Sequence, residues 1–241
     1  MSWLSRIFGG GGSAAKVALT PEQSARLEAW RRLPKPDTAR SHFQTRYIVA
    51  DVEASGLNMV KDRLISIGAV GVSNGMINAV DAFEVILRQD IVSTHENILI
   101  HGIGGSAQRE GVDPVEALLR FLEYAGKATL VAYHAEFDRR MIAKAMQEFL
   151  GVEVEMLWID LAYIMPELHR ELIDRLVGLD EWMQCFDIEN IQRHNAVSDA
   201  FATAKLLQVA ITRGATLGKD CTDTFVEIET ARRWLQKRGG A

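Results

Sequence analysis

Between residues 46 and 87 the apolar residues fall into three short runs that are separated by polar turns. The runs predict strands over about 46–53, 63–72 and 76–87, because they are rich in β-branched residues and are bounded by turn-forming residues. Asn74-Gly75 separates the second run from the third, and this dipeptide is a strong hairpin signal. The pattern therefore predicts an antiparallel meander of three strands.

After residue 112 most apolar positions repeat at helical spacing. This spacing predicts helices over about 114–124, 136–150, 161–176, 179–186, 197–212 and 222–237. Two short apolar runs, 129–134 and 156–160, predict further strands, and a loop that precedes a helix is the simplest interpretation of segment 96–103. The fold class that follows is α/β, with a mixed five-stranded sheet (a three-strand antiparallel meander, then two further strands) flanked by helices.

The chain before residue 46 is expected to lie outside the main domain. Thr20 and Gln23 can form a capping box that starts a helix, and Pro34 and Pro36 end it. Gly9 to Gly12 form a flexible break before this helix. The apolar residues that precede the break are predicted to be a disordered terminus, with a short docking peptide as the alternative.

Charge is distributed unevenly along the chain, although the net charge is only −5. Residues 1–46 carry a balance of +5, residues 47–212 a balance of −12, and residues 213–241 a balance of +2. We therefore predict a basic N-terminal extension with a helical arm (1–45), a central domain (46–213) and a basic C-terminal helix (214–241). This charge argues against holding nucleic acid by bulk electrostatics alone. Solvated surface charge explains the balance equally well.

Two classes of protein are disfavoured. Cys185 and Cys221 form no CxxC pair, so neither a zinc site nor a disulfide framework is expected. No apolar stretch approaches the roughly 18 residues of a membrane span. The apolar run among the first residues is too short for the apolar region of a secretion signal. The sequence therefore predicts no membrane association and, by default, a cytoplasmic location.

Asp51 and Glu53 are the first candidates for chemistry. They lie two residues apart on a predicted strand, so their side chains share one face. Carboxylate oxygens on one face are suitable ligands for Mg²⁺ or Mn²⁺. Taken alone, the pair fits a solvated strand end equally well.

Three further residues extend this set. Asp138 lies just inside a predicted helix that follows a buried strand, where an ordinary first-turn aspartate is the alternative. His194 precedes a later helix and Asp199 lies in its first turns. Histidine suits the role of general base because a free imidazole titrates near neutrality. A surface histidine before a helix is the simpler interpretation of His194.

The order and context of these pieces resemble the DEDDh exonucleases of the RNase H-like fold. DVEASGLN is similar to that family's Asp-x-Glu motif, HAEFD to its His-Asn-x-x-Phe-Asp motif, and HNAVSDA to its His-x-Ala-x-x-Asp-Ala motif. The resemblance covers about residues 47–207. It implies a 3′→5′ exonuclease that hydrolyses phosphodiester bonds at DNA 3′ ends and releases nucleoside 5′-monophosphates, in proofreading or repair.

The resemblance also implies roles for individual residues and a cofactor. Two divalent metal ions, Mg²⁺ or Mn²⁺, would be held by Asp51, Glu53, Asp138 and Asp199, with Asp51 between the ions and His194 as the base.

Segment 96–103 resembles the His-Gly-Ile segment of the proofreading epsilon subunit of bacterial DNA polymerase III. This likeness implies that Glu96 and His101 contact the nucleotide. Leu57 would pack against the terminal base, and Ala54 would lie beside the same nucleotide. These substrate contacts would add to those of Asp51, Glu53, His194 and Asp199.

Two residues depart from the family pattern. Ala54 stands where Thr or Ser is usual, and Ala135 stands where Asn is usual. These changes put substrate affinity in doubt more than the chemistry. We expect Asp160 to cap a helix and not to bind metal.

Three alternatives stay open at the level of sequence. The substrate is predicted to be a single-stranded DNA 3′ end, but an RNA 3′ end fits the same motifs. A non-catalytic nucleic-acid or partner-binding module would keep the same fold. The terminal extensions are candidates for docking a polymerase or another protein, or for packing against the chain's own domain.

Overall fold

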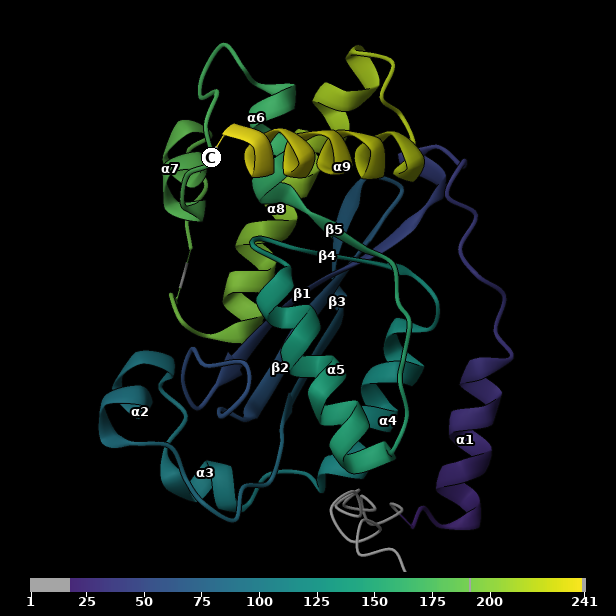
Figure 1. The fold of residues 1–241 in the computed structure, drawn as a ribbon, viewed down its shortest axis with the longest axis vertical. Coiled ribbons are helices and arrows are strands. Elements are labelled where there is room, and N and C mark those ends of the chain that lie inside the picture. The colour runs from purple at the N-terminus through teal and green to yellow at the C-terminus, as the bar shows by residue number, and fades with distance from the viewer. Residues whose placement is uncertain (1–17, 191, 240–241) are drawn as a thin grey trace, which may run out of the picture.

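The apolar run that begins at Arg46 forms the central strand of one five-stranded sheet in the computed structural model (Figure 1). The structure describes residues 18–190 and 192–239. The strands are β1 (Arg46–Ala54), β2 (Leu64–Ser73), β3 (Met76–Ile86), β4 (Thr129–Ala132) and β5 (Trp158–Asp160). Their order across the sheet is β3-β2-β1-β4-β5. β1, β2 and β3 pair antiparallel, whereas β4 and β5 run parallel to β1, which confirms the predicted fold class.

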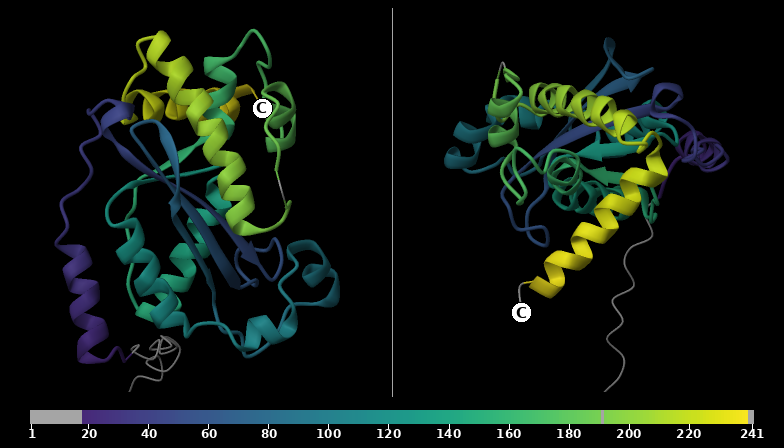
Figure 2. Two further views of the ribbon diagram at one scale, coloured as in Figure 1. Left: turned by 180° about the vertical axis from the view of Figure 1, so that it is seen from behind. Right: turned by 90° about the horizontal axis from the view of Figure 1, so that it is seen from above.

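Alternate residues of β1 pack into two separate cores, one on each face of the sheet. Ile48, Ala50 and Val52 lie in the core that is covered by α4 (Pro114–Ala125) and α5 (Glu136–Leu150). Tyr47 and Val49 lie in the opposite core. That second core is covered by α6 (Leu161–Leu168), α7 (Leu179–Cys185), α8 (Ala196–Thr216) and the start of α9 (Thr222–Gly239). Figure 2 shows α8 crossing the back of the sheet.

The predicted N-terminal helix is α1 (Pro21–Arg31), and it begins with the expected capping box between Thr20 and Gln23. This helix packs against α4 instead of standing free. Arg26 forms ion pairs of 2.6 and 2.7 Å with Glu116 and Glu123 of α4. Trp30 is buried and donates its indole N–H to the carbonyl oxygen of Gly126 at 2.6 Å.

The segment that precedes β1 packs against the start of α9. The short helix η1 (His42–Gln44) precedes β1, and its His42 ring lies 4.2 Å from the Phe225 ring of α9. Tyr47 hydrogen-bonds both His42 and Thr222 at 2.6 Å. α9 therefore packs against the domain, over α6 and β5. The division into three parts stays a prediction.

Two expectations about local structure were wrong. Segment 96–103, for which a loop was the simpler interpretation, lies largely in the short helix α2 (His95–His101), and the short helix α3 (Gly105–Arg109) follows it. The helix predicted over 161–176 ends at Leu168 as α6. His169 leaves the helical conformation at φ −130° and ψ 46°, and its buried ring packs 4.9 Å from Phe186. Packing between distant segments thus ends a helix whose local periodicity continues.

The predicted docking peptide or disordered terminus, together with Gly9 to Gly12, lies outside the described residues. Across the described helices, none combines the length and apolarity that a membrane crossing requires.

Candidate active site

The end of β1 and the first turn of α8 bring three of the predicted carboxylates together. Asp51 and Glu53 point to the same face of the sheet, toward Asp199 of α8. One oxygen from each carboxylate lies within 4.8 Å of the others. Three hard oxygen ligands at this spacing suit a divalent cation such as Mg²⁺ or Mn²⁺. The residues present therefore fit the predicted metal site.

Gly68 explains how α8 comes so close to the sheet. It lies on β2 directly opposite Asp51. A Cβ atom at this position would lie 2.3 Å from the backbone of both Ala196 and Val197, at the start of α8. Because a side chain is absent here, the first turn of α8 rests on β2. Asp199 is thereby carried to the carboxylates of β1.

Asp138 reaches the same edge from the other face of the sheet. It lies in the first turn of α5 and is buried. Its carboxylate accepts a hydrogen bond of 3.0 Å from the backbone N–H of Val52, the residue between Asp51 and Glu53. Asp138 is not among the three carboxylates that share the closest spacing. Its charge nevertheless acts on Asp51.

Burial raises the pKa values of Asp51, Glu53 and Asp138, and neighbouring charges raise them further. Burial raises the pKa of Asp51 well above its ordinary value, and the charges of Asp138, Glu53 and Asp199 raise it further. Burial, followed by the charges of Asp199 and Asp138, raises the pKa of Glu53 to about 8. Burial is also the largest cause that raises the pKa of Asp138 to about 8, although the Val52 N–H opposes it. A bound divalent cation would remove this repulsion.

Asp199 has three neighbours that hold it in place. Arg193 forms an ion pair with it at 3.0 Å, and Asn190 donates a side-chain hydrogen bond to it. The backbone N–H of His194 donates to its other oxygen at 2.9 Å. Sequence reasoning missed Arg193 and Asn190. Their partner lies across a turn, and no spacing pattern indicates the contact.

His194 is exposed beside this cluster. Its backbone has φ of +60°, which is uncommon for a residue with a side chain. The backbone hydrogen bond to Asp199 offsets part of the cost of this conformation. The residue is exposed to solvent, and its backbone is tied to a carboxylate of the cluster, which suits the predicted base. That role stays a prediction.

The predicted nucleotide contacts fall into two groups. Leu57 is 87% exposed in the loop after β1, and Ala54 is buried at the end of that strand. Glu96 is exposed on α2, but His101 is buried at the end of the same helix. One ring nitrogen of His101 contacts Asn97 and the other accepts from the backbone of Ile103, both at 2.9 Å. In this structure His101 therefore closes α2 and offers no free ring nitrogen to a nucleotide.

Asp160 has the structural role that was predicted for it. It is the N-cap of α6, and its side chain accepts from the backbone N–H of Ala162 at 3.1 Å.

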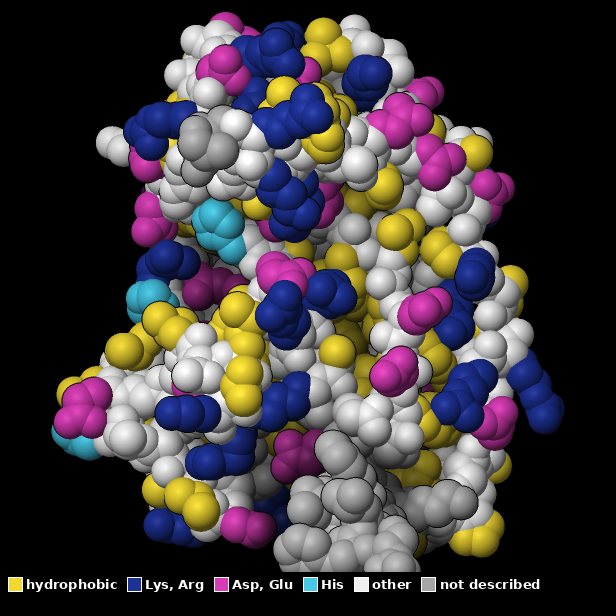
Figure 3. All heavy atoms as spheres, in the orientation of Figure 1, with side chains coloured by type: hydrophobic (Ala, Val, Ile, Leu, Met, Phe, Trp, Pro, Cys, Tyr) yellow, Lys and Arg dark blue, Asp and Glu magenta, His cyan; other side chains and the backbone are white. Residues whose placement is uncertain are grey.

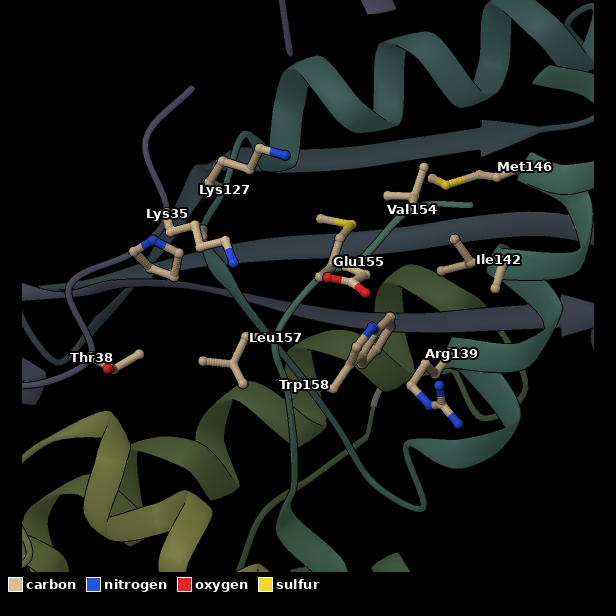
Figure 4. Close-up of a pocket in the computed structure, with 14 residues that line it drawn as sticks. Lys35, Thr38, Lys127, Arg139, Ile142, Met146, Val154, Glu155, Leu157 and Trp158 are labelled. Carbon is tan, nitrogen blue, oxygen red and sulfur yellow. The ribbon is translucent and has the colours of Figure 1, made fainter. Parts of the chain in front are cut away.

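A separate groove lies beside α5, and Figure 4 shows the residues that line it. Its volume is about 600 Å³. Apolar residues such as Ile142 and Met146 line it together with Lys35, Lys127 and Arg139. None of the predicted site residues lines this groove. Figure 3 shows basic side chains interspersed with acidic ones on the face that it views, without one dominant sign.

Comparison with known proteins places the chain in a family. The sequence profile of a family described as an exonuclease matches residues 48–207. The chain is 32% identical over 168 residues to a PolC-type DNA polymerase III of Caldanaerobacter subterraneus subsp. tengcongensis, which covers 70% of this chain and 12% of that protein. It is also 32% identical to the PolC-type DNA polymerase III of Bacillus subtilis, over 67% of this chain and 11% of that protein. The chain therefore spans only about a tenth of the length of these relatives.

Solved structures share the fold at low identity. E. coli exonuclease I in complex with a dT13 oligonucleotide superposes with a TM-score of 0.60 at 17% identity, over 72% of this chain and 42% of that chain. Exonuclease X in complex with 5′ overhanging duplex DNA has a TM-score of 0.59 at 18% identity, over 76% and 99% of the two chains. These likenesses confirm the predicted fold, and the profile match confirms the predicted DEDDh resemblance. The chain belongs to the exonuclease family.

Proposed function

We propose that this chain is a metal-dependent 3′→5′ exonuclease that removes nucleotides from DNA 3′ ends and releases nucleoside 5′-monophosphates. The observation that carries the proposal is the cluster of Asp51, Glu53 and Asp199, with one oxygen of each within 4.8 Å of the others. Three carboxylates at this spacing suit a divalent cation, and burial and repulsion raise the pKa values of two of them, Asp51 and Glu53.

In this proposal each site residue has a role in metal binding, proton transfer or substrate contact. Asp51, Glu53 and Asp199 would hold one divalent ion, and Asp138 would help Asp51 to hold a second. Bound ions would polarise the phosphate and the water that attacks it. His194 takes a proton from that water; the residue is exposed, and its backbone N–H is bound to Asp199. Leu57, exposed in the loop after β1, packs against the terminal base.

Two comparisons support DNA as the substrate and a polymerase as a context. The relatives with 32% identity are DNA polymerases, and the structure of exonuclease I contains a dT13 oligonucleotide. We propose that the chain acts in proofreading or repair, on single-stranded DNA ends that a polymerase or another protein presents.

A gel assay tests the activity. Single-stranded DNA and RNA with a label at the 5′ end are incubated with the protein in Mg²⁺, Mn²⁺ or EDTA. We expect a metal-dependent ladder that shortens from the 3′ end of DNA and is lost in the His194→Ala protein. His95→Ala, which removes an exposed histidine of α2, is the matched control and should keep full activity.

The outcomes separate the alternatives. A ladder on RNA alone would replace DNA with RNA as the substrate. Retained binding without cleavage of either strand would indicate a non-catalytic module. Wild-type turnover by the His194→Ala protein would exclude the mechanism proposed here.

A further inference from the structure

A buried carboxylate at the end of β5 organises the sheet edge next to the candidate active site. Asp160 is only 2% exposed and pairs with Ala132, the last residue of β4. One of its oxygens accepts from the backbone N–H of His134 at 2.9 Å, in addition to that of Ala162. Asp160 thereby joins the start of α6 to the turn that leads from β4 into α5.

The counter-ion of Asp160 comes from the C-terminal helix. Arg233 of α9 donates to the second oxygen of Asp160 at 3.0 Å. Glu229, one turn earlier on α9, accepts from the backbone N–H of Asp160 at 2.9 Å and from Arg233 at 2.8 Å. The guanidinium of Arg233 also lies 4.1 Å from the ring centre of Tyr163. Two side chains of α9 thus satisfy both the charge and the backbone of one buried residue.

The turn that Asp160 holds is under backbone strain and lacks a side-chain cap. His134 has φ of +60°, which favours glycine over a residue with a side chain. α5 then begins at Glu136, and its N-cap residue, Ala135, provides no side-chain cap. Asp138 lies in the first turn of this helix, and its hydrogen bond to Val52 depends on where that turn stands. A shift of His134 would therefore move Asp138 relative to the carboxylates of β1.

We propose that Arg233 is a positioning residue for the nuclease site, acting through Asp160 and the His134 turn on the placement of Asp138. α9 begins at Thr222, whereas the family match ends at residue 207. The C-terminal helix is thus an addition to the family's domain that completes the catalytic edge. The inference rests on the proposed function, because it concerns the same site.

The test compares two neighbouring arginines of α9. Arg233→Met removes the counter-ion of Asp160. Arg232→Met is the matched control, because Arg232 pairs with Glu167 and Asp174 and makes no contact with Asp160. Removing a partner that orients a metal ligand commonly changes metal affinity or activity about 10- to 100-fold. Because Arg233 acts through intervening groups, we expect about a tenfold effect.

Two measurements distinguish positioning from general stability. Mn²⁺ binding, followed by the electron paramagnetic resonance of free Mn²⁺, should weaken in the Arg233→Met protein and not in the Arg232→Met protein. In the DNA assay, kcat should fall and the Mn²⁺ concentration for half-maximal rate should rise, while KM for the oligonucleotide stays constant. Arg233→Lys, which keeps the charge, should recover part of both losses.

Equal Mn²⁺ binding and equal kcat in the two Met variants, at matched melting temperatures, would overturn the inference. If Arg233→Met does not fold, Arg233→Lys and Glu229→Gln are compared instead, again by their Mn²⁺ binding and kcat at matched melting temperatures. The proposed function and this inference fail differently. Absence of nuclease activity in the wild-type protein would overturn the function, whereas Mn²⁺ binding would still test the role of Arg233.

Discussion

Replacing Glu53 with glutamine should stabilise the metal-free protein at alkaline pH and leave it unchanged at acid pH. Glu53 lies within a cluster of acids, where burial and the charges of Asp199 and Asp138 raise its pKa to about 8 from an ordinary 4.5. The folded protein therefore keeps a proton on Glu53 in a pH range where the unfolded chain has lost it. Glutamine keeps the shape of the side chain and removes the charge.

The sign and the size follow from this pKa. Between about pH 4.5 and pH 8 the folded state binds more protons than the unfolded state, so stability falls as the pH rises through that window. At about 1.4 kcal/mol per pKa unit the full effect would be about 5 kcal/mol. Glu53 is only partly buried, and solvent and Arg193 screen its charge, so we expect about 2 kcal/mol.

Urea denaturation in EDTA measures this difference. At about pH 8.5 the Glu53→Gln protein should be about 2 kcal/mol more stable than wild type, a rise in melting temperature of roughly 4–8 °C. At about pH 4.5 the two proteins should unfold alike. Glu84→Gln, which changes an exposed glutamate of β3, is the matched control and should show no such pH dependence. Adding Mn²⁺ should stabilise the wild type more than the Glu53→Gln protein, because the ligand is intact.

The reasoning would be refuted if the Glu53→Gln protein were equally or less stable than wild type at about pH 8.5 in EDTA. A gain of the same size at both pH values would also contradict it. That result would mean that the substitution acts through packing and not through the charge.

Three other substitutions test the geometry. Gly68→Ala should lower activity about 100-fold, because the new Cβ would meet the backbone of α8 and displace Asp199. A crystal structure would measure the displacement of Asp199 and the DNA assay the loss of activity. Full activity would contradict the close approach of α8 to β2. Leu57→Ala should leave the melting temperature unchanged, because Leu57 is 87% exposed. It should raise KM for DNA several-fold, because the proposed contact with the terminal base is lost. An unchanged KM would exclude that contact. Trp30→Ala should destabilise the protein by about 3 kcal/mol in urea denaturation, because Trp30 is buried against α4, while kcat stays near that of wild type.

The sequence predicts the sheet and the site carboxylates because both depend on patterns close together in the chain. Asp51 and Glu53 share a face through strand alternation, and Asn74-Gly75 does form the predicted turn between β2 and β3. The helix α2 was missed although its signals were present. Thr94 caps it, and Gly102 ends it in the left-handed conformation. These two residues outweigh the absence of a long periodic run.

The sequence does not predict which charged groups pair across turns or between separate helices. Arg193 pairs with Asp199 across a turn, and Arg233 reaches Asp160 from a helix that begins more than 60 residues later. Arginine and aspartate are common on surfaces, so neither type indicates burial. The partner of such a residue is decided by packing of the helices, which periodicity alone does not determine.

The site combines rigid supports with groups that repel one another. Asp51 lies in a strand paired on both sides, Asp138 is tied to the backbone of Val52, and Asp199 is tied to that of His194. Asp138 and Asp199 would each lose a hydrogen bond on moving away. Burial, followed by the charges of Asp138, Glu53 and Asp199, raises the pKa of Asp51, and burial is the largest cause that raises the pKa of Asp138. A bound divalent cation would offset the cost of ionising these acids, so the affinity for the ion depends on the rigidity of these supports as much as on the ligands themselves.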